Sequence, residues 1–370
     1  MSNIHQPICS VIPEYMIRRV ADHGDDEDHQ TSATTLQQTR LIAARRRQTA
    51  EVEPSRAVTT PKKRRSVFDA WFSRTLPGHL IMDENKKSAD LEAIEAFEGA
   101  GKTYDFYWKF LQRNSIDDRG MVLKSTIHYG QNFDNAMWDG SRMIYGDGDG
   151  KLFGRFTGSL DIIAHEHTHG VTQYTAGLTY TGQTGALNEH ISDAIGIMVK
   201  QYNSVLTGTE DDWLIGRDLF TINVKGKAIR SMAAPGTAYD DPILGRDPQP
   251  AHMRDYVRTT DDNGGVHINS GIPNRAYYLA GTGIGKEPWT VLVPIWYHVL
   301  TKKLRRNAKF ADMARETVIA AGELFGADSQ VKHIIRDAWD AVGVPAVAKK
   351  SGPSGAQTRR VNKWRDRPAA

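Results

Sequence analysis

The spacing of apolar residues predicts a strand-rich half followed by a helical half. Between residues 122 and 156, short apolar segments alternate with glycine and aspartate turns, a pattern typical of β-strands. From Leu160 onward, apolar residues recur at spacings of three or four, and this periodicity predicts long helices, including those at 291–304, 308–325 and 329–342.

One predicted helix carries a chemical motif. The apolar run 160–164 leads into His165-Glu166-His167-Thr168-His169. Residues four apart lie on one face of a helix, so His165 and His169 can direct both imidazoles at one metal ion. Glu166 lies beside them, where a base that deprotonates the attacking water belongs. His167 points to the opposite side and is predicted to be a structural or surface histidine.

A second predicted helix, residues 186–199, offers a further ligand. By itself the first motif also fits an ordinary helix with two histidines. Glu189 can complete a three-ligand site with an open fourth position, and Asp193, four residues later, can accept the spare N–H of a ligating histidine. The alternative for these two residues is a solvated acidic face.

Together these residues resemble the thermolysin-type neutral metalloendopeptidases, in particular their protealysin-like branch. Nineteen residues, 170 to 188, separate His169 from Glu189, as in that family, and the resemblance extends from about Tyr104 to Val344. It implies a two-domain α+β fold with the metal-binding helix at the junction of the halves. It also implies one catalytic zinc ion held by His165, His169 and Glu189, and an enzyme that acts on peptide or protein substrates.

The resemblance assigns catalytic roles as well. Glu166 is implied as the general base, Tyr180 and His267 as donors to the oxyanion, and Asp262 as the residue that orients His267. Taken alone, Tyr180 equally fits a core tyrosine, and His267, after two glycines, a loop histidine.

Substrate-binding residues are implied in the same way. Arg230 matches an arginine that holds a substrate carbonyl group, and Asn135 and Ala136 match the edge that pairs with substrate backbone. Four apolar residues resemble the pocket for the residue after the scissile bond: Phe153, Phe156, Ile162 and Ile229. We therefore expect cleavage before bulky hydrophobic residues such as Leu, Phe or Ile. The alternative is that these four residues only pack the core.

The first 55 residues differ from the rest and are predicted to form a pro-segment and linker. Segment 11–20, followed by a polar run and a helix-prone stretch at 35–47, resembles the short pro-segment of the protealysin-like branch, with Glu14 in place of its second proline. The resemblance implies an intramolecular inhibitor and a zymogen. Residues 51–60 are the expected maturation region, and 62–65 (Lys-Lys-Arg-Arg) a solvated basic patch.

The family resemblance also implies secretion. No signal peptide is visible at residues 1–12, so retention in the cytoplasm or a non-classical export route stays open. Cys9, the single cysteine, rules out an intramolecular disulfide; it is a surface or packed cysteine, or an inhibitory thiolate that reaches the zinc.

Composition adds few constraints. The chain has 370 residues and a net charge of +3, which gives no case for a nucleic-acid partner, and no apolar run is long enough to span a membrane. We expect a monomer. The expected organisation is pro-segment and linker (1–55), strand-rich domain with the metal-binding helix (56–185), helical domain (186–346) and a basic, disordered tail (347–370).

Calcium is the main departure from the family. Asp161 and Asp212 match two of its calcium ligands, but other acidic positions are replaced, by Lys200, Leu214, Arg217 and Lys227. Ammonium and guanidinium groups can neutralise Asp161 and Asp212 directly. The sequence therefore predicts that calcium is dispensable at these sites.

Three other classes of protein fit the sequence less well. A zinc exopeptidase needs an acidic anchor for a free amino terminus, and none is evident in the sequence. A catalytically silent binding module would be expected to lack the base or a ligand, and all are present. A structural zinc protein would usually close the fourth position with another Cys or His, and the local sequence offers no obvious candidate.

Overall fold

The computed structural model describes residues 9–48, 61–207 and 212–346. Six of its strands form one mixed sheet in the order β1-β5-β6-β4-β2-β3. Their bounds are β1 (Cys9–Ser10), β2 (Arg65–Asp69), β3 (His79–Asp83), β4 (Leu123–Ile127), β5 (Ala136–Trp138) and β6 (Met143–Tyr145). The pairs β2–β4 and β4–β6 are parallel, and the other three pairs are antiparallel. The predicted strand-rich half is thus confirmed.

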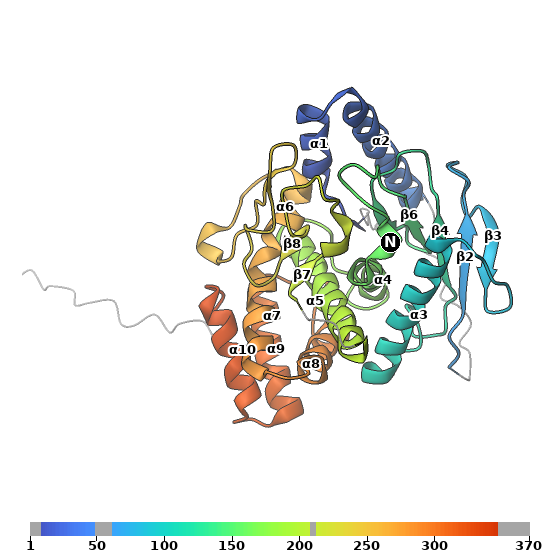
Figure 1. The fold of residues 1–370 in the computed structure, drawn as a ribbon. Coiled ribbons are helices and arrows are strands. Elements are labelled where there is room, and N and C mark those ends of the chain that lie inside the picture. The colour runs from blue at the N-terminus through green and yellow to red at the C-terminus, as the bar shows by residue number, and fades with distance from the viewer. Residues whose placement is uncertain (1–8, 49–60, 208–211, 347–370) are drawn as a thin grey trace, which may run out of the picture.

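Helices α3 (Leu91–Leu111) and α4 (Leu160–Gln173) belong to this half, and α3 packs against both β2 and α4. Helix α4 lies at the centre of the molecule, seen end-on in Figure 1, between the sheet and the helical half. Its residues from Asp161 to Thr172 are all buried. Helix α4 is therefore a core element with a fixed orientation.

The helical half follows from residue 182. It comprises α5 (Gly182–Thr207), α6 (Asp262–Asn269), α7 (Gly271–Ile284), α8 (Trp289–Lys302), α9 (Phe310–Phe325) and α10 (Gln330–Ala341), with short strands β7 (Leu214–Ile215), β8 (Arg230–Ser231), β9 (Asp240–Asp241) and β10 (Gly245–Arg246) between α5 and α6. The three helices predicted nearest the C-terminus are confirmed within two residues at each end. Among the described residues, no helix is long and apolar enough to cross a membrane.

Helices α4 and α5 approach each other closely because of one glycine. A Cβ atom at Gly196 of α5 would lie 2.6 Å from the backbone oxygen of Asp161 in α4, which is closer than real Cβ contacts allow. The absence of a side chain there brings the two helices into contact, and this sets the faces of α4 and α5 against each other.

The N-terminal segment is folded onto both halves. Strand β1 is followed by α1 (Glu14–His23) and α2 (Asp26–Gln48), which lie above the body of the molecule in Figure 1. Helix α2 is longer than the predicted stretch 35–47, because the polar run before it is helical too. Three acidic residues, Asp26, Glu27 and Asp28, occupy its first turn, where negative charge stabilises a helix.

The prediction of a solvated basic patch at 62–65 is wrong for its last two residues. Arg65 begins β2, and its side chain is only 14% exposed; its Nε lies 3.0 Å from Glu84 Oε1, and its guanidinium lies 3.6 Å from the centre of the Phe97 ring. Arg64 donates to the backbone oxygen of Gly120. Strand pairing draws both guanidinium groups into contacts that a charge run alone does not reveal.

Several predicted boundaries are not settled by the structure. The expected maturation region 51–60 and the basic tail 347–370 lie outside the described residues. The expected domain division at 185/186 falls inside α5 and stays a prediction.

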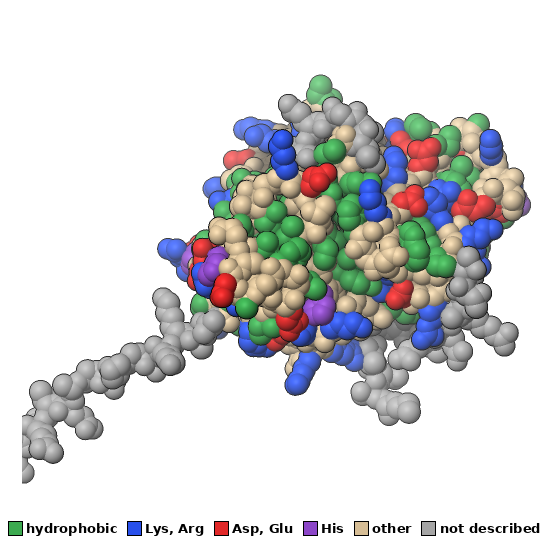
Figure 2. Space-filling view, turned by 90° about the horizontal axis from the view of Figure 1, so that it is seen from below, with side chains coloured by type: hydrophobic (Ala, Val, Ile, Leu, Met, Phe, Trp, Pro, Cys, Tyr) green, Lys and Arg blue, Asp and Glu red, His purple; other side chains and the backbone are tan. Residues whose placement is uncertain are grey.

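On the face shown in Figure 2, Lys and Arg side chains are interspersed with Asp and Glu.

Candidate active site

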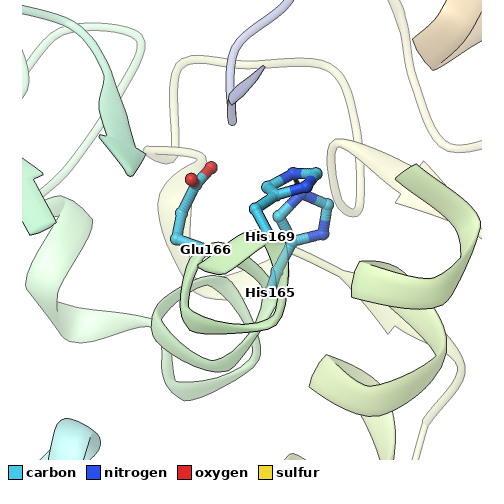
Figure 3. Close-up of side chains that lie close together, drawn as sticks. All are labelled: His165, Glu166 and His169. Carbon is cyan, nitrogen blue, oxygen red and sulfur yellow. Dashed lines mark hydrogen bonds between the residues drawn. The ribbon is translucent and has the colours of Figure 1, made fainter. Parts of the chain in front are cut away.

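The two motif histidines of α4 converge on one point. His165 Nε2 and His169 Nε2 lie 2.9 Å apart, and both rings project from the same side of the helix (Figure 3). Glu189 of α5 lies 3.4 Å from His165 Nε2 and 3.3 Å from His169 Nε2. All three side chains are buried. Two nitrogens and a carboxylate at one buried point form the donor set of a zinc site.

The Nδ1 atoms of both histidine rings have hydrogen-bond partners. His165 Nδ1 lies 2.8 Å from Asp193 Oδ1, and His169 Nδ1 lies 2.9 Å from Asn188 Oδ1 and 3.1 Å from Ser192 Oγ. These contacts turn both Nε2 atoms toward the shared point.

The charges and protonation of these residues suit the binding of a cation. Burial lowers the pKa of His169 to about 3, which leaves its imidazole neutral, as metal binding requires. Burial also lowers the pKa of His165, but Asp193 and Glu189 outweigh it and raise that pKa to about 10. A buried Glu189 Oε2 lacks a hydrogen-bond partner. The residues present thus fit a bound metal ion.

Glu166 is separate from this donor set. Its Oε2 accepts a hydrogen bond of 2.9 Å from the backbone N–H of Trp138, whereas its Oε1 is buried without a hydrogen-bond partner. A ring nitrogen from each of His165 and His169 and a carboxylate oxygen of Glu166 lie close enough together to hold a metal ion, but Figure 3 shows the Glu166 carboxylate turned away from the two rings. Burial raises the pKa of Glu166 to about 8, which suits a proton acceptor near neutral pH.

Asp193 connects His165 to Arg230. Arg230 donates to both carboxylate oxygens of Asp193, at 2.9 and 2.8 Å, and Asn274 Nδ2 donates to Oδ2 at 2.8 Å. Arg230 is 2% exposed, and its Nη1 has no hydrogen-bond partner, so one donor is still unused. Arg230 therefore holds Asp193 in place and retains a free N–H group.

Tyr180 and His267 lie on the other side of Glu189. The Tyr180 hydroxyl donates to Glu189 Oε1 and lies 3.1 Å from His267 Nε2. Asp262 Oδ1 lies 2.6 Å from His267 Nδ1, and its Oδ2 accepts from the His267 backbone N–H at 2.8 Å. Asp262 thereby orients the ring of His267 so that Nε2 faces the Glu189 carboxylate, 3.5 Å away.

Strand β5 presents its edge beside these groups, and the N-terminal segment is bound to it. Cys9 and Ser10 pair antiparallel with Trp138 and Met137. Next along the chain, the Val11 N–H donates to the Ala136 carbonyl at 3.0 Å. The Asn135 side chain accepts from the Ile12 N–H at 3.0 Å and donates to the Ile12 carbonyl at 3.1 Å. The predicted edge thus binds an extended peptide backbone, here the chain's own.

The four predicted pocket residues are all buried in the main hydrophobic core, which also contains Val11. The Phe153 and Phe156 rings lie 6.3 Å apart, and Phe153 also lies 6.0 Å from Phe220. Ile162 belongs to α4, and Ile229 precedes β8. His167, predicted to be structural, is buried and lies 2.8 Å from the Ile163 carbonyl through its Nδ1.

A cluster of charges lies at the other end of α4. Lys200 Nζ lies 3.6 Å from Asp161 Oδ2, 3.1 Å from Asp212 Oδ1 and 3.1 Å from the Leu214 carbonyl. Arg217 Nη1 lies 2.7 Å from Asp212 Oδ2. Lys227 is exposed. The Lys200 ammonium is therefore surrounded by oxygens, as a bound cation would be.

Sequence reasoning missed the supporting residues Asn188, Ser192 and Asn274. The first two are four apart on the predicted helix that carries Glu189, so helical spacing offered a signal for them. Asn274 comes from α7, and nothing local connects it to Asp193.

A buried His-His-Glu donor set beside a further buried carboxylate and a strand edge that binds peptide backbone is the arrangement of a metallopeptidase. Two family models match the chain: the thermolysin metallopeptidase catalytic domain over residues 26–173 and the alpha-helical domain over 176–344. The chain belongs to the thermolysin family and is a metalloendopeptidase of the protealysin-like type. The predicted α+β fold and family are confirmed.

Named relatives cover nearly the whole chain. An extracellular metalloprotease of Pectobacterium carotovorum subsp. carotovorum is 46% identical over 92% of this chain and 97% of the relative. Protease PrtS of Photorhabdus sp. (strain Az29) is 39% identical over 90% and 91%. Among solved structures, the precursor of protealysin, a metalloproteinase from Serratia proteamaculans, matches with a TM-score of 0.82 and 44% identity over 91% of this chain and 99% of that chain.

Proposed function

We propose that this chain is the secreted zymogen of a zinc-dependent endopeptidase that hydrolyses internal peptide bonds before bulky hydrophobic residues. The observation that carries the proposal is the convergence of His165, His169 and Glu189 beside a strand edge that binds an extended peptide. Secretion is supported by the relative described as extracellular.

His165, His169 and Glu189 are the residues that would hold the ion, with Asp193 orienting His165. When bound, zinc supplies a Lewis acid that polarises a carbonyl group and lowers the pKa of water. The pairing of Asp193 with Arg230 keeps this carboxylate ionised, since Arg230 and His165 hold the Asp193 pKa well below its usual range against the effect of burial.

The catalytic steps follow from the remaining side chains. Glu166 takes a proton from the attacking water and returns it to the leaving nitrogen, for which its buried, unpartnered Oε1 is available. Tyr180 and His267 donate to the oxyanion that develops at the scissile carbonyl, and Asp262 positions His267.

Substrate is proposed to bind as an added strand. The Asn135 side chain and the Ala136 carbonyl pair with its backbone, and the free Nη1 of Arg230 holds a carbonyl group. Phe153, Phe156, Ile162 and Ile229 form the pocket for the residue after the scissile bond. A peptide-library profile tests the specificity, and a preference for charged residues at that subsite would refute it.

The decisive experiment compares the wild type with Glu166→Ala. Both should bind one zinc ion per chain, because Glu166 is not in the proposed ligand set. Casein cleavage by the variant should fall by at least about 1000-fold. If Glu166→Ala bound a full equivalent of zinc and cleaved casein at the wild-type rate, the mechanism would be refuted. Cleavage of internally quenched peptides blocked at both ends separates an endopeptidase from an exopeptidase.

The N-terminal segment is proposed to inhibit the enzyme from within. Its residues 9–12 occupy the strand edge that substrate needs, and Ser10 O lies 3.1 Å from His267 Nε2. Maturation is expected in 51–60, and the mature enzyme is expected to be a monomer with domains at 56–185 and 186–346.

Calcium is proposed to be dispensable beside α4. The Lys200 ammonium already contacts Asp212 and the Leu214 carbonyl and lies near Asp161, and Arg217 neutralises Asp212 further. A calcium-selective chelator that leaves zinc bound should change the melting temperature by less than about 2 °C. A large fall in that temperature would contradict the proposal.

A further inference from the structure

The N-terminal segment runs along β5 in one defined direction. Strand β1 is antiparallel to β5, and the antiparallel path continues through the hydrogen bond from Val11 N–H to the Ala136 carbonyl. Both backbone groups of Ile12 are then held by the Asn135 side chain. Strand β1 ends at Ser10, and the hydrogen bonds of Val11 and Ile12 continue along β5, so backbone groups on both sides of the Ser10–Val11 peptide bond have partners.

The catalytic groups identify that bond. The Ser10 carbonyl oxygen lies 3.1 Å from His267 Nε2, which itself lies 3.1 Å from the Tyr180 hydroxyl and 3.5 Å from Glu189 Oε2. An endopeptidase places its scissile carbonyl against its oxyanion donors and close to the metal ligands. Among residues 9–12, Ser10 supplies the carbonyl that contacts such a donor.

The residue after this bond has the chemistry that the proposed pocket requires. Val11 is apolar and fully buried, and it belongs to the same hydrophobic cluster as Phe153, Phe156, Ile162 and Ile229. Pro13 then ends the extended stretch and precedes α1. The direction of the segment along β5, the position of the Ser10 carbonyl and the apolar side chain of Val11 thus all place Ser10–Val11 as the scissile bond.

Resting on the proposed function, we propose that residues 9–12 bind in the register of a substrate and that the zinc-loaded chain first hydrolyses its own Ser10–Val11 bond. The C–N bond breaks, and the oxygen of the attacking water joins the Ser10 carbonyl carbon. Glu166 carries a water proton to the Val11 nitrogen. The products are residues 1–10 with a free carboxylate and a chain that begins at Val11.

The test starts from full-length chain purified in the presence of a metal chelator. After zinc is added, intact-mass measurement and N-terminal sequencing should show Val11 as the first new terminus. Because the bond is tethered to its own catalytic site, the rate should not change on tenfold dilution. Glu166→Ala, loaded with zinc, should keep its full mass.

Two variants separate register from general instability. Val11→Leu should still be cut before residue 11. Val11→Asp places a charge against the apolar pocket, so cleavage before residue 11 should fall by about 100-fold or more. Since the segment then binds poorly, casein cleavage by Val11→Asp should begin without a lag, which shows that the enzyme is folded.

Each other result overturns the inference. A first cut elsewhere in the chain, or an intact Ser10–Val11 bond while casein is cleaved, refutes the register and leaves the proposed function standing. A rate proportional to protein concentration shows cutting between molecules. A zinc-loaded wild-type chain that cleaves neither itself nor casein refutes the register and the proposed function together.

Discussion

Lys200 places an ammonium group between two carboxylates at one end of α4. Its side chain is 15% exposed and contacts the carboxylates of Asp161 and Asp212, of which Asp161 is fully buried. A buried carboxylate without a positive partner is strongly unfavourable, so the ammonium stabilises the end of α4. The sequence predicted this ion pairing, because a lysine stands where the family resemblance implies an acid; that calcium is dispensable there stays a prediction.

Replacing Lys200 with Met, which keeps most of the volume, should lower the free energy of unfolding by about 3 kcal/mol, because Asp161 is left buried without a counter-charge. Arg217→Met is the matched control. Its side chain is 56% exposed, so its loss should cost less than about 1 kcal/mol. Urea unfolding monitored by circular dichroism measures both, and equal effects would contradict this account.

At the scale of elements, His128 links the end of β4 to the start of α3 and to the loop after β6 through two carboxylates. It follows β4 and lies 2.8 Å from Asp147 Oδ2, in the loop after β6, and 3.1 Å from Asp90 Oδ2, at the start of α3. The hydrogen bond to Asp147, reinforced by Asp90 against the effect of burial, raises the pKa of His128 to about 9.

This pKa predicts how stability depends on pH. Because the pKa is raised on folding, the stabilisation is complete below the unfolded value of about 6.5 and is lost as the pH rises through about 9. Replacing His128 with Asn, which tolerates its φ of +49°, should flatten the decline in melting temperature across this window. If the melting temperatures of the wild type and the variant fall in parallel as the pH rises, deprotonation of His128 is not the cause of the fall.

A lysine of the catalytic region contacts the start of helix α2. Lys151 Nζ lies 2.7 Å from Asp28 Oδ2 and 2.6 Å from Asp25 Oδ2, and Asp28 is only 3% exposed. Asp28→Ala should therefore weaken docking of the N-terminal segment and shorten the lag before casein cleavage by about tenfold. Glu27→Ala, an exposed neighbour, should leave the lag unchanged. A lag that is equally long in Asp28→Ala would show that this ion pair does not anchor α2.

For the whole molecule, the metal ion is expected to join the two halves, since its proposed ligands come from α4 and α5. Dialysis against a zinc chelator should abolish casein cleavage and lower the melting temperature by several degrees, because ligand binding stabilises only the folded chain. One equivalent of zinc should restore both, and calcium should restore neither. Unchanged melting after zinc removal would mean that the halves are held by packing alone.

How far the sequence could predict the molecule depended on the range of the interaction. Helical spacing revealed His165, His169, Glu189 and Asp193, because their geometry is set within two helices. The binding of residues 9–12 to β5, and the contact of Asn274 with Asp193, join segments far apart in the chain, and no local pattern encodes them. The role of Arg65 was missed for the same reason, since its partners belong to β3 and α3.

The ammonium group beside Asp161 and Asp212 has a consequence for where the protein can work. A dissociable ion stabilises in proportion to the logarithm of its concentration, so its contribution disappears when the medium is depleted of it. A cation fixed to the backbone by a four-carbon side chain cannot be diluted or chelated. We therefore expect the folded lifetime of this protein to be the same in calcium-rich and calcium-starved surroundings.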